Sequence, residues 1–181
     1  MRRIPHYVTV VLIMLMERAK NAFTFDTMMQ WLWITGLVIT LDQVSKWLMV
    51  SWLSLYESVV VMPLFNLTMA HNTGAAFSFL SQAGGWQRWF FVVLALTISL
   101  GLLIWLKKSA KTNLEALSIS LILGGAIGNV IDRIYYGYVI DFLDVYYGSY
   151  HWPAFNVADS AIVIGAALLL FDSFRSQPEL T

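Results

Sequence analysis

The chain has 181 residues, of which 59% are hydrophobic and only 12% are charged, and its mean hydropathy is +0.68. An ordinary soluble domain has roughly 45–50% apolar and 25% charged residues, so this composition argues against a water-soluble protein. Eleven basic residues balance eleven acidic ones, which leaves no positive excess for a nucleic acid backbone. The absence of cysteine excludes disulfides, thiolate nucleophiles and cysteine-bound metals.

The pattern of apolar segments predicts an all-α polytopic membrane protein with four transmembrane helices. A hydrocarbon core of about 30 Å needs roughly 20 apolar residues per helix. We expect spans at about 31–53, 89–106, 114–134 and 155–174. The stretch from Val59 to Leu80 mixes β-branched, aromatic and turn-forming residues, which predicts a small β-rich outer segment between the first two spans.

Basic residues that flank the spans indicate the orientation, because Lys and Arg collect on the cytoplasmic side of a membrane. They precede the first span, follow the second and follow the fourth, at Arg18, Lys20, Lys107, Lys108 and Arg175. Both termini are then cytoplasmic, with 54–88 and 135–154 outside. We expect a cytoplasmic or interfacial extension at 1–28, with a cleaved segment as the alternative. The four-span domain then covers 29–175 and a cytoplasmic tail covers 176–181.

Ionisable residues in a span need an explanation, because each costs about 2.5–3.5 kcal/mol at the helix centre on insertion scales. Asp42 and Lys46 lie four residues apart, which suits an ion pair on one helix face. Four more aspartates gather on the predicted outer side, at Asp132, Asp141, Asp144 and Asp159. Should Asp141 and Asp159 approach closely, one keeps its proton while the other ionises, which produces a general acid and a general base. The alternative for each aspartate taken alone is a solvated loop charge.

Five short blocks of sequence, spread over about 29–175, resemble a known family. They are LDQVSK (Leu41–Lys46), HNTGAAFSF (His71–Phe79), GGAIGNVIDR (Gly124–Arg133), GYVIDF (Gly137–Phe142) and PAFNVADS (Pro153–Ser160). Together they resemble the lipoprotein signal peptidase family, signal peptidase II. The resemblance implies an aspartic endopeptidase that removes the signal peptide of diacylglyceryl-modified prolipoproteins, cutting before the lipidated cysteine. It implies a multi-pass protein of the bacterial inner membrane with its active site at the periplasmic face.

By this resemblance the catalytic pair falls on Asp141 and Asp159, and Asp132 is a rival for the first position. We favour Asp141 because Arg133 is suited to holding Asp132 ionised in a structural pair. Asp144 then remains a solvated loop charge without a role. Substrate binding or support of the pair is expected from Asn72, Gly74, Asn129, Asp132, Arg133, Asn156, Asp42 and Lys46.

More specific expectations follow for these groups. Asp42 and Lys46 would brace the first span or face the lipid-modified substrate. The segment 71–79 would be partly mobile and clamp the substrate, since Gly74 permits backbone conformations that a side chain hinders. We expect no cofactor, no metal and no nucleic acid partner. The expected partners are the prolipoprotein and membrane lipid, and the protein is expected to be a monomer.

Two other interpretations stay open at this point. A small transporter subunit would conduct protons or cations along Asp42, Asp132 and Asp159, although these acids cluster toward one side of the bilayer. A divalent-cation site would use Asp141, Asp144 and Asp159, because carboxylates suit hard cations. Ion flux in liposomes and sensitivity to chelators distinguish these two from a peptidase.

Overall fold

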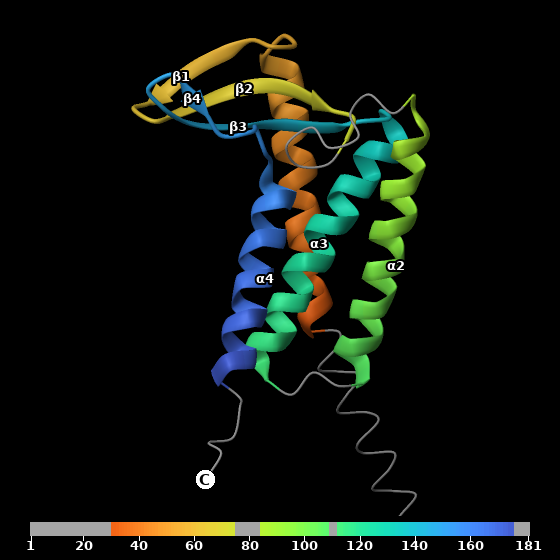
Figure 1. Cartoon of the computed structure of the whole chain (residues 1–181). Helices are drawn as coiled ribbons and strands as arrows, with labels where there is room; N and C mark the ends of the chain where they lie inside the picture. The colour runs from red at the N-terminus through yellow and green to blue at the C-terminus, as the bar shows by residue number, and fades with distance from the viewer. Residues whose placement is uncertain (1–29, 75–83, 109–111, 176–181) are drawn as a thin grey trace, which may run out of the picture.

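The computed structural model describes residues 30–74, 84–108 and 112–175. This part of the chain has four helices. They run side by side, and a small sheet lies across one end of them (Figure 1). The first helix covers 30–52, and the others are α2 (Trp86–Lys108), α3 (Asn113–Tyr135) and α4 (Val157–Arg175). The predicted extension at 1–28, the tail at 176–181 and most of the predicted clamp at 71–79 lie outside the described residues.

Each predicted span falls on one of these helices, with its ends within three residues of the observed ones. Helices α2, α3 and α4 are long and apolar enough to cross a membrane. Helix α4 begins two residues later than predicted, because Phe155 still belongs to the sheet. Its backbone N–H donates to Leu143 O at 3.0 Å, so the helix cannot include it.

The sheet is antiparallel, with strand order β1-β2-β3-β4. Its strands are β1 (Ser58–Met62), β2 (Phe65–Asn72), β3 (Val139–Tyr147) and β4 (Tyr150–His151). The sequence analysis placed strands only between the first two spans and treated 135–154 as a loop, which is wrong for β3 and β4. Residues 139–142 are all buried, so β3 lacks the alternation of apolar and polar residues that reveals a half-exposed strand.

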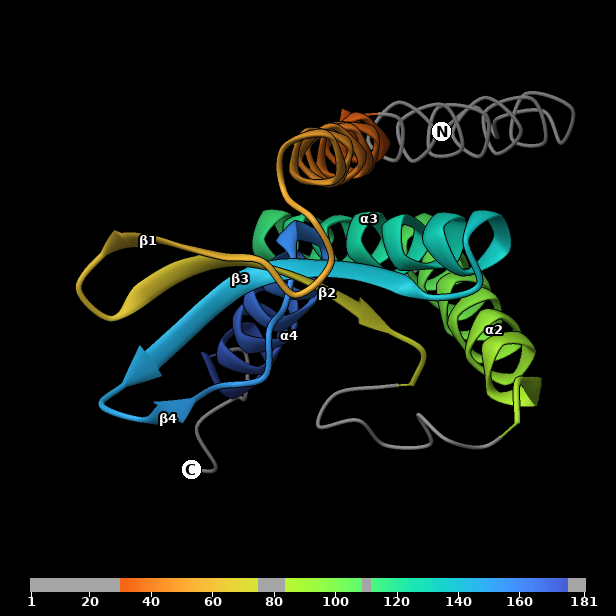
Figure 2. The same ribbon diagram turned by 90° about the horizontal axis from the view of Figure 1, so that it is seen from above.

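Helix α3 occupies the centre of the bundle. Viewed from above, the first helix lies on one side of α3, and α2 and α4 lie on the other (Figure 2). A Cβ atom added to Gly124 would lie 2.6 Å from Cβ of Val38 in the first helix. One added to Gly165 of α4 would lie 2.7 Å from Ser118 O in α3. Small residues therefore let these backbones approach closely, as is usual in membrane bundles.

An apolar cluster fixes the sheet to the end of the bundle. It joins Leu53, just after the first helix, to Met69 of β2 and to Ile140 and Phe142 of β3. All four side chains are buried. This packing holds β3 across the helix ends, next to the start of α4.

Candidate active site

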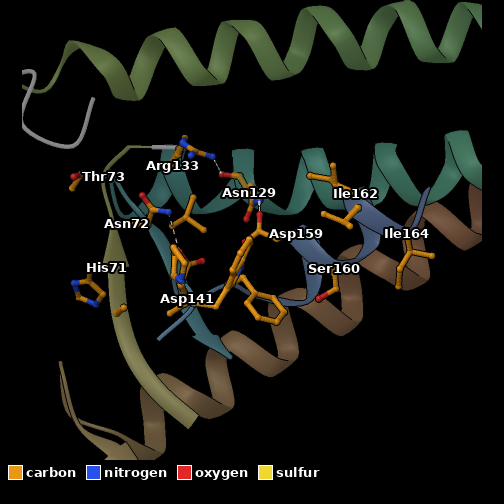
Figure 3. A pocket seen from close by; sticks show the side chains of 17 residues that line it. His71, Asn72, Thr73, Asn129, Arg133, Asp141, Asp159, Ser160, Ile162 and Ile164 are labelled. Carbon is orange, nitrogen blue, oxygen red and sulfur yellow. Dashed lines mark hydrogen bonds between the residues drawn. The ribbon is translucent and has the colours of Figure 1, made fainter. Parts of the chain in front are cut away.

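A cavity of about 860 Å³ lies where the sheet meets the ends of α3 and α4. Asp141 of β3 and Asp159 of α4 both line it, as Figure 3 shows. Around them are Asn72, Asn129 and Arg133. The cavity continues along α4 past apolar side chains at 162–164. The structure thus brings the two predicted catalytic carboxylates into one cavity that is polar at one end and apolar at the other.

The first turn of α4 fixes the carboxylate of Asp159. Asp159 N–H donates to Asn156 Oδ1 at 2.8 Å, and Asn156 N–H donates to Asp159 Oδ2 at 3.2 Å. This reciprocal pair between the N-cap residue and the third helical residue is a capping box. The local sequence Asn-Val-Ala-Asp therefore starts the helix and orients the acid at the same time.

Amide side chains hold both carboxylates of the pair. Asn156 Nδ2 donates to Asp141 Oδ1 at 2.7 Å, and Asn72 Nδ2 donates to Asp141 Oδ2 at 3.0 Å. Asn129 Nδ2 donates to Asp159 Oδ1 at 2.8 Å. Asn156 is fully buried and bonds to both acids, so it fixes the position of one carboxylate relative to the other.

The environment of Asp141 changes its acidity. Burial, followed by the nearby charge of Asp159, raises the pKa of Asp141 to about 7. The hydrogen bonds from Asn72 and Asn156 and the charge of Lys46 oppose this rise. A carboxyl group with this pKa carries a proton about half of the time at neutral pH. Asp141 is therefore suited to donating and accepting a proton under physiological conditions.

A buried ion cluster lies behind the cavity. Lys46 Nζ is 2.8 Å from Asp42 Oδ2 and 2.8 Å from Asp132 Oδ2, with all three side chains at most 2% exposed. Of the two roles predicted for Asp42 and Lys46, their burial favours bracing of the helix over contact with a substrate. The partner of Asp132 is Lys46 and not Arg133, so the predicted ion pair between sequence neighbours is wrong. The two side chains leave α3 in different directions, because adjacent residues on a helix do not face each other.

The two aspartates of this cluster each hold the backbone next to a carboxylate of the cavity. Asp132 Oδ2 accepts from the N–H of Ile140, the neighbour of Asp141, at 3.1 Å. Asp42 Oδ1 accepts from the N–H of Ala158, the neighbour of Asp159, at 2.9 Å. A negative charge at this place also stabilises the N-terminus of α4. The buried cluster therefore positions β3 and α4 relative to each other.

Arg133 lines the cavity and contacts the segment just after β2. Its Nη2 donates to Gly74 O at 2.8 Å, and Gly74 N–H donates to Asn72 Oδ1 at 3.0 Å. Its guanidinium carbon lies 5.2 Å from the ring centroid of Phe91 in α2. Arg133 thus links α3 to the end of β2 and orients the amide that bonds to Asp141.

Asp144 is not the solvated loop charge that the sequence suggested. It lies in β3, it is 4% exposed, and its carboxylate bonds to Asn66 and His151. Asp141 and Asp144 are three residues apart on one strand, so their side chains point to opposite faces. The three carboxylates of the alternative cation site therefore do not converge. Among the residues that the structure describes, no group of three or more His, Asp or Glu side chains is arranged to hold a metal ion.

The sequence analysis missed two residues of this region. Gln43 Nε2 donates to Asp132 Oδ1 at 2.9 Å, and its only signal was its place inside the block LDQVSK. His71 was not named among the expected site residues, but it lies in β2, lines the cavity and stacks on Tyr138 with ring centroids 3.8 Å apart. Burial lowers the pKa of His71, which favours a neutral ring at the cavity wall.

Comparison with known proteins identifies the family. A family model described as signal peptidase (SPase) II matches residues 34–175. The chain belongs to the signal peptidase II family. The lipoprotein signal peptidase of Alteromonas mediterranea is 55% identical over 152 residues, which are 83% of this chain and 84% of that protein. The lipoprotein signal peptidase of Shewanella oneidensis is 49% identical over 156 residues, which are 85% of this chain and 92% of that protein.

A solved structure is similar to most of this chain. It is a bacterial membrane enzyme that superimposes with a TM-score of 0.72 at 32% identity, covering 84% of this chain and 94% of that one. The family assignment confirms the resemblance carried by the five sequence blocks. It also confirms the prediction of an aspartic-type peptidase of the signal peptidase II family.

Proposed function

We propose that this signal peptidase II family member removes the signal peptide of diacylglyceryl-modified prolipoproteins, cutting before the lipidated cysteine with Asp141 and Asp159. The observation that carries this proposal is the pair of amide-held carboxylates in one cavity, one of them with a pKa of about 7. The names of the relatives support the substrate class, since they are lipoprotein signal peptidases.

The pair hydrolyses a peptide bond without a covalent intermediate. Asp159 takes a proton from a water molecule as the water oxygen attacks the carbonyl carbon of the peptide bond. Asp141 gives its own proton to the carbonyl oxygen. The intermediate then collapses: Asp159 passes its proton to the leaving amine as the C–N bond breaks, and a hydroxyl proton returns to Asp141. Asn72 and Asn156 hold Asp141 in place, and Asn129 holds Asp159.

The surroundings of Asp132 also favour Asp141 as the first catalytic carboxylate. Asp132 is fully buried and is not among the residues that line the cavity. It already accepts from Lys46, Gln43 and Ile140. A carboxylate held by these donors is suited to a structural role.

The apolar part of the cavity suits a substrate that carries acyl chains. It follows α4, where Val163 is 66% and Ile164 is 53% exposed. We place the acyl chains in hydrocarbon beside this helix, which brings the scissile bond to the polar end of the cavity. Such a substrate stays in the membrane while it is cleaved.

We propose that all four helices span the membrane and that the sheet end faces the periplasm. The first helix buries Asp42 and Lys46 against α3, while Trp33, Leu41 and Val44 are each about half exposed or more. The bundle end opposite the sheet carries Lys107, Lys108 and Arg175, as the positive-inside rule requires of the cytoplasmic side. The proposed domain is 29–175, and since the whole site comes from one chain, a monomer suffices.

The test is cleavage by the purified protein of a prolipoprotein with and without its diacylglyceryl group. Asp141→Asn and Asp159→Asn keep the shape of the site and are each expected to lower the rate by at least about 10²–10⁴-fold. Asp172→Asn is the matched control: it lies in α4 at the other end, bonded to Thr112, and is expected to cleave normally. Chelators are expected to leave the rate unchanged.

Three outcomes contradict parts of this proposal. Near-normal cleavage by both Asp141→Asn and Asp159→Asn overturns the aspartic mechanism and reopens the transporter, which ion flux in liposomes then tests. A folded but inactive Asp132→Asn beside an active Asp141→Asn reassigns the first carboxylate. Equal cleavage of the unmodified substrate overturns the proposed requirement for lipid.

A further inference from the structure

Hydrogen-bonded side chains connect all four strands of the sheet, away from the two catalytic carboxylates. Ser58 Oγ of β1 is 2.7 Å from Thr68 Oγ1 of β2, which donates to Asp144 Oδ2 of β3 at 3.3 Å. Asn66 Nδ2, also on β2, donates to the same oxygen at 3.0 Å. On the other side, Nδ1 of His151 in β4 lies 2.9 and 3.0 Å from the two carboxylate oxygens. Asp144 therefore joins three strands through its side chain.

Strand β4 depends on few other contacts. It has two residues, paired as Tyr146↔His151 and Tyr147↔Tyr150. The hairpin turns at Gly148, whose φ of 61° suits the first position of a tight turn. The ring of His151 also stacks on Tyr146 at 5.3 Å. With so short a ladder, the bond between Asp144 and His151 is a large part of what holds β4 to β3.

The residues after His151 form one wall of the cavity. The four residues 152–155 all line it, and Asn156 follows as the cap of α4 that bonds to Asp141. Backbone bonds tie this wall to β3 at its two ends, from Trp152 N–H to Val145 O at 2.8 Å and from Phe155 N–H to Leu143 O at 3.0 Å. The wall therefore begins directly after β4, and the first of its two bonds to β3 lies next to His151.

We propose that Asp144 and His151 form a clasp that positions the cavity wall at 152–155 for the substrate. This inference rests on the proposed peptidase function and adds two positioning residues to it. Neither side chain is among those that line the cavity, so the clasp acts through the wall and not on the scissile bond. The side chain of His151 is 53% exposed and that of Asp144 is 5% exposed. The buried carboxylate of Asp144 fixes the orientation of the His151 ring. A ring with a proton on Nδ1 can donate this hydrogen bond in both its neutral and its charged form.

The clasp predicts an effect on substrate binding with little effect on the chemical step. His151→Ala is expected to raise KM by about tenfold, the scale of a lost hydrogen bond to a charged group, with kcat within about twofold of the parent. His151→Asn places an amide donor where Nδ1 was and is expected to restore most of KM. Tyr150→Ala, on the same strand with its side chain exposed, is the matched control and is expected to leave KM unchanged.

A second measurement separates binding from turnover. In the Asp159→Asn background, where the substrate is not cleaved, His151→Ala is expected to raise the Kd for the lipid-modified prolipoprotein by the same factor. Combining Asp144→Asn with His151→Ala is expected to add little to the larger single effect, because both act through one contact.

The outcomes distinguish the clasp from the peptidase itself. If Asp159→Asn cleaves normally, the proposed function fails. If Asp159→Asn is inactive but His151→Ala binds substrate like its parent, only the clasp is overturned. A drop in thermal stability with KM unchanged, equal effects of His151→Ala and His151→Asn, or failure of all these variants to fold, shows a purely structural contact and also overturns it.

Discussion

Helices α2 and α3 have the same length, 23 residues, but opposite relations to the site. In its most apolar stretch α2 has 17% of its residues buried inside the protein, whereas α3 has 61%. Helix α2 is the more hydropathic of the two, and in α3 the polar residues Asn129, Asp132 and Arg133 are all buried. Of these two helices, the one that more resembles a lipid-exposed span contributes less to the catalytic region, and the other forms the centre of the protein.

The difference in polarity between the two helices follows from what surrounds each of them. Lipid offers no hydrogen-bonding partners, so a helix that faces it must be apolar. A helix enclosed by other helices can carry polar side chains when each finds a partner. Asn129 shows this: it donates to Asp159 and accepts from Lys46 and Asn156. Polar residues in a predicted span therefore indicate a protein-facing helix and a functional centre.

The largest loss of stability is expected when a polar partner of α3 is removed. Lys46→Met leaves Asp42 and Asp132 buried without their common cation, and breaking a buried ion pair costs about 3–5 kcal/mol. Lys107→Met, at the exposed end of α2, is the matched control and is expected to change the unfolding free energy little. Thermal unfolding in detergent measures both. Equal stability of the two variants would remove the contrast between the helices.

A smaller effect is expected from adding one methyl group. A Cβ at position 128 of α3 would lie 2.6 Å from Asp42 Oδ2, whereas one at position 101 of α2 meets nothing within 4 Å. Gly128→Ala is therefore expected to destabilise by about 1–3 kcal/mol through overpacking. Gly101→Ala is expected to be neutral or stabilising, because alanine favours the helix. A destabilising Gly101→Ala would contradict a lipid-exposed position.

The acidity of Asp141 gives a pH prediction. Its proton is lost as pH rises through about 7, so cleavage should decline on the alkaline side. Asn72 donates to the carboxylate and lowers this pKa, and its removal therefore raises the pKa. Asn72→Ala is expected to move the alkaline decline of kcat/KM, which reports the free enzyme, to higher pH. It is also expected to reduce cleavage far more than thermal stability.

Thr97→Ala of α2 is the control for that profile, because Thr97 bonds only its own helix at Val93 O among the described residues. Its pH profile is expected to match the parent. An unshifted profile for Asn72→Ala, or a shift to lower pH, would show that Asp141 does not control the alkaline decline.

The smallest effect is expected from deleting residues 2–27. Every residue of the proposed site and of its buried support lies between Asp42 and Ile164. The truncated protein is expected to insert and cleave like the full chain, measured by membrane fractionation and substrate turnover. Normal insertion with loss of cleavage would give the proposed extension a role in the reaction.

The sequence alone predicted the four helices and a β-rich segment within 59–80, where the structure has β1 and β2. Through the family resemblance it also named Asp141 and Asp159 as the pair, with Asp132 as a rival, and both carboxylates line the cavity. Helix positions follow from runs of apolar residues, because the hydrophobic period and the length are local properties of a sequence. The five blocks from Leu41 to Ser160 gave the family. The cap of α4 at Asn156 and Asp159 is also local, since its residues lie three apart.

Only the tertiary structure decided which charges meet. Lys46 binds Asp132 from another helix, while adjacent Arg133 turns toward Gly74. Asp144 is buried because β3 pairs with β2 on one side and β4 on the other. The sequence of β3 does not show which strands will be its neighbours. Which partner a charged side chain binds depends on the direction and distance between segments that are remote in the chain. The position of a charge in the sequence gives neither the direction nor the distance.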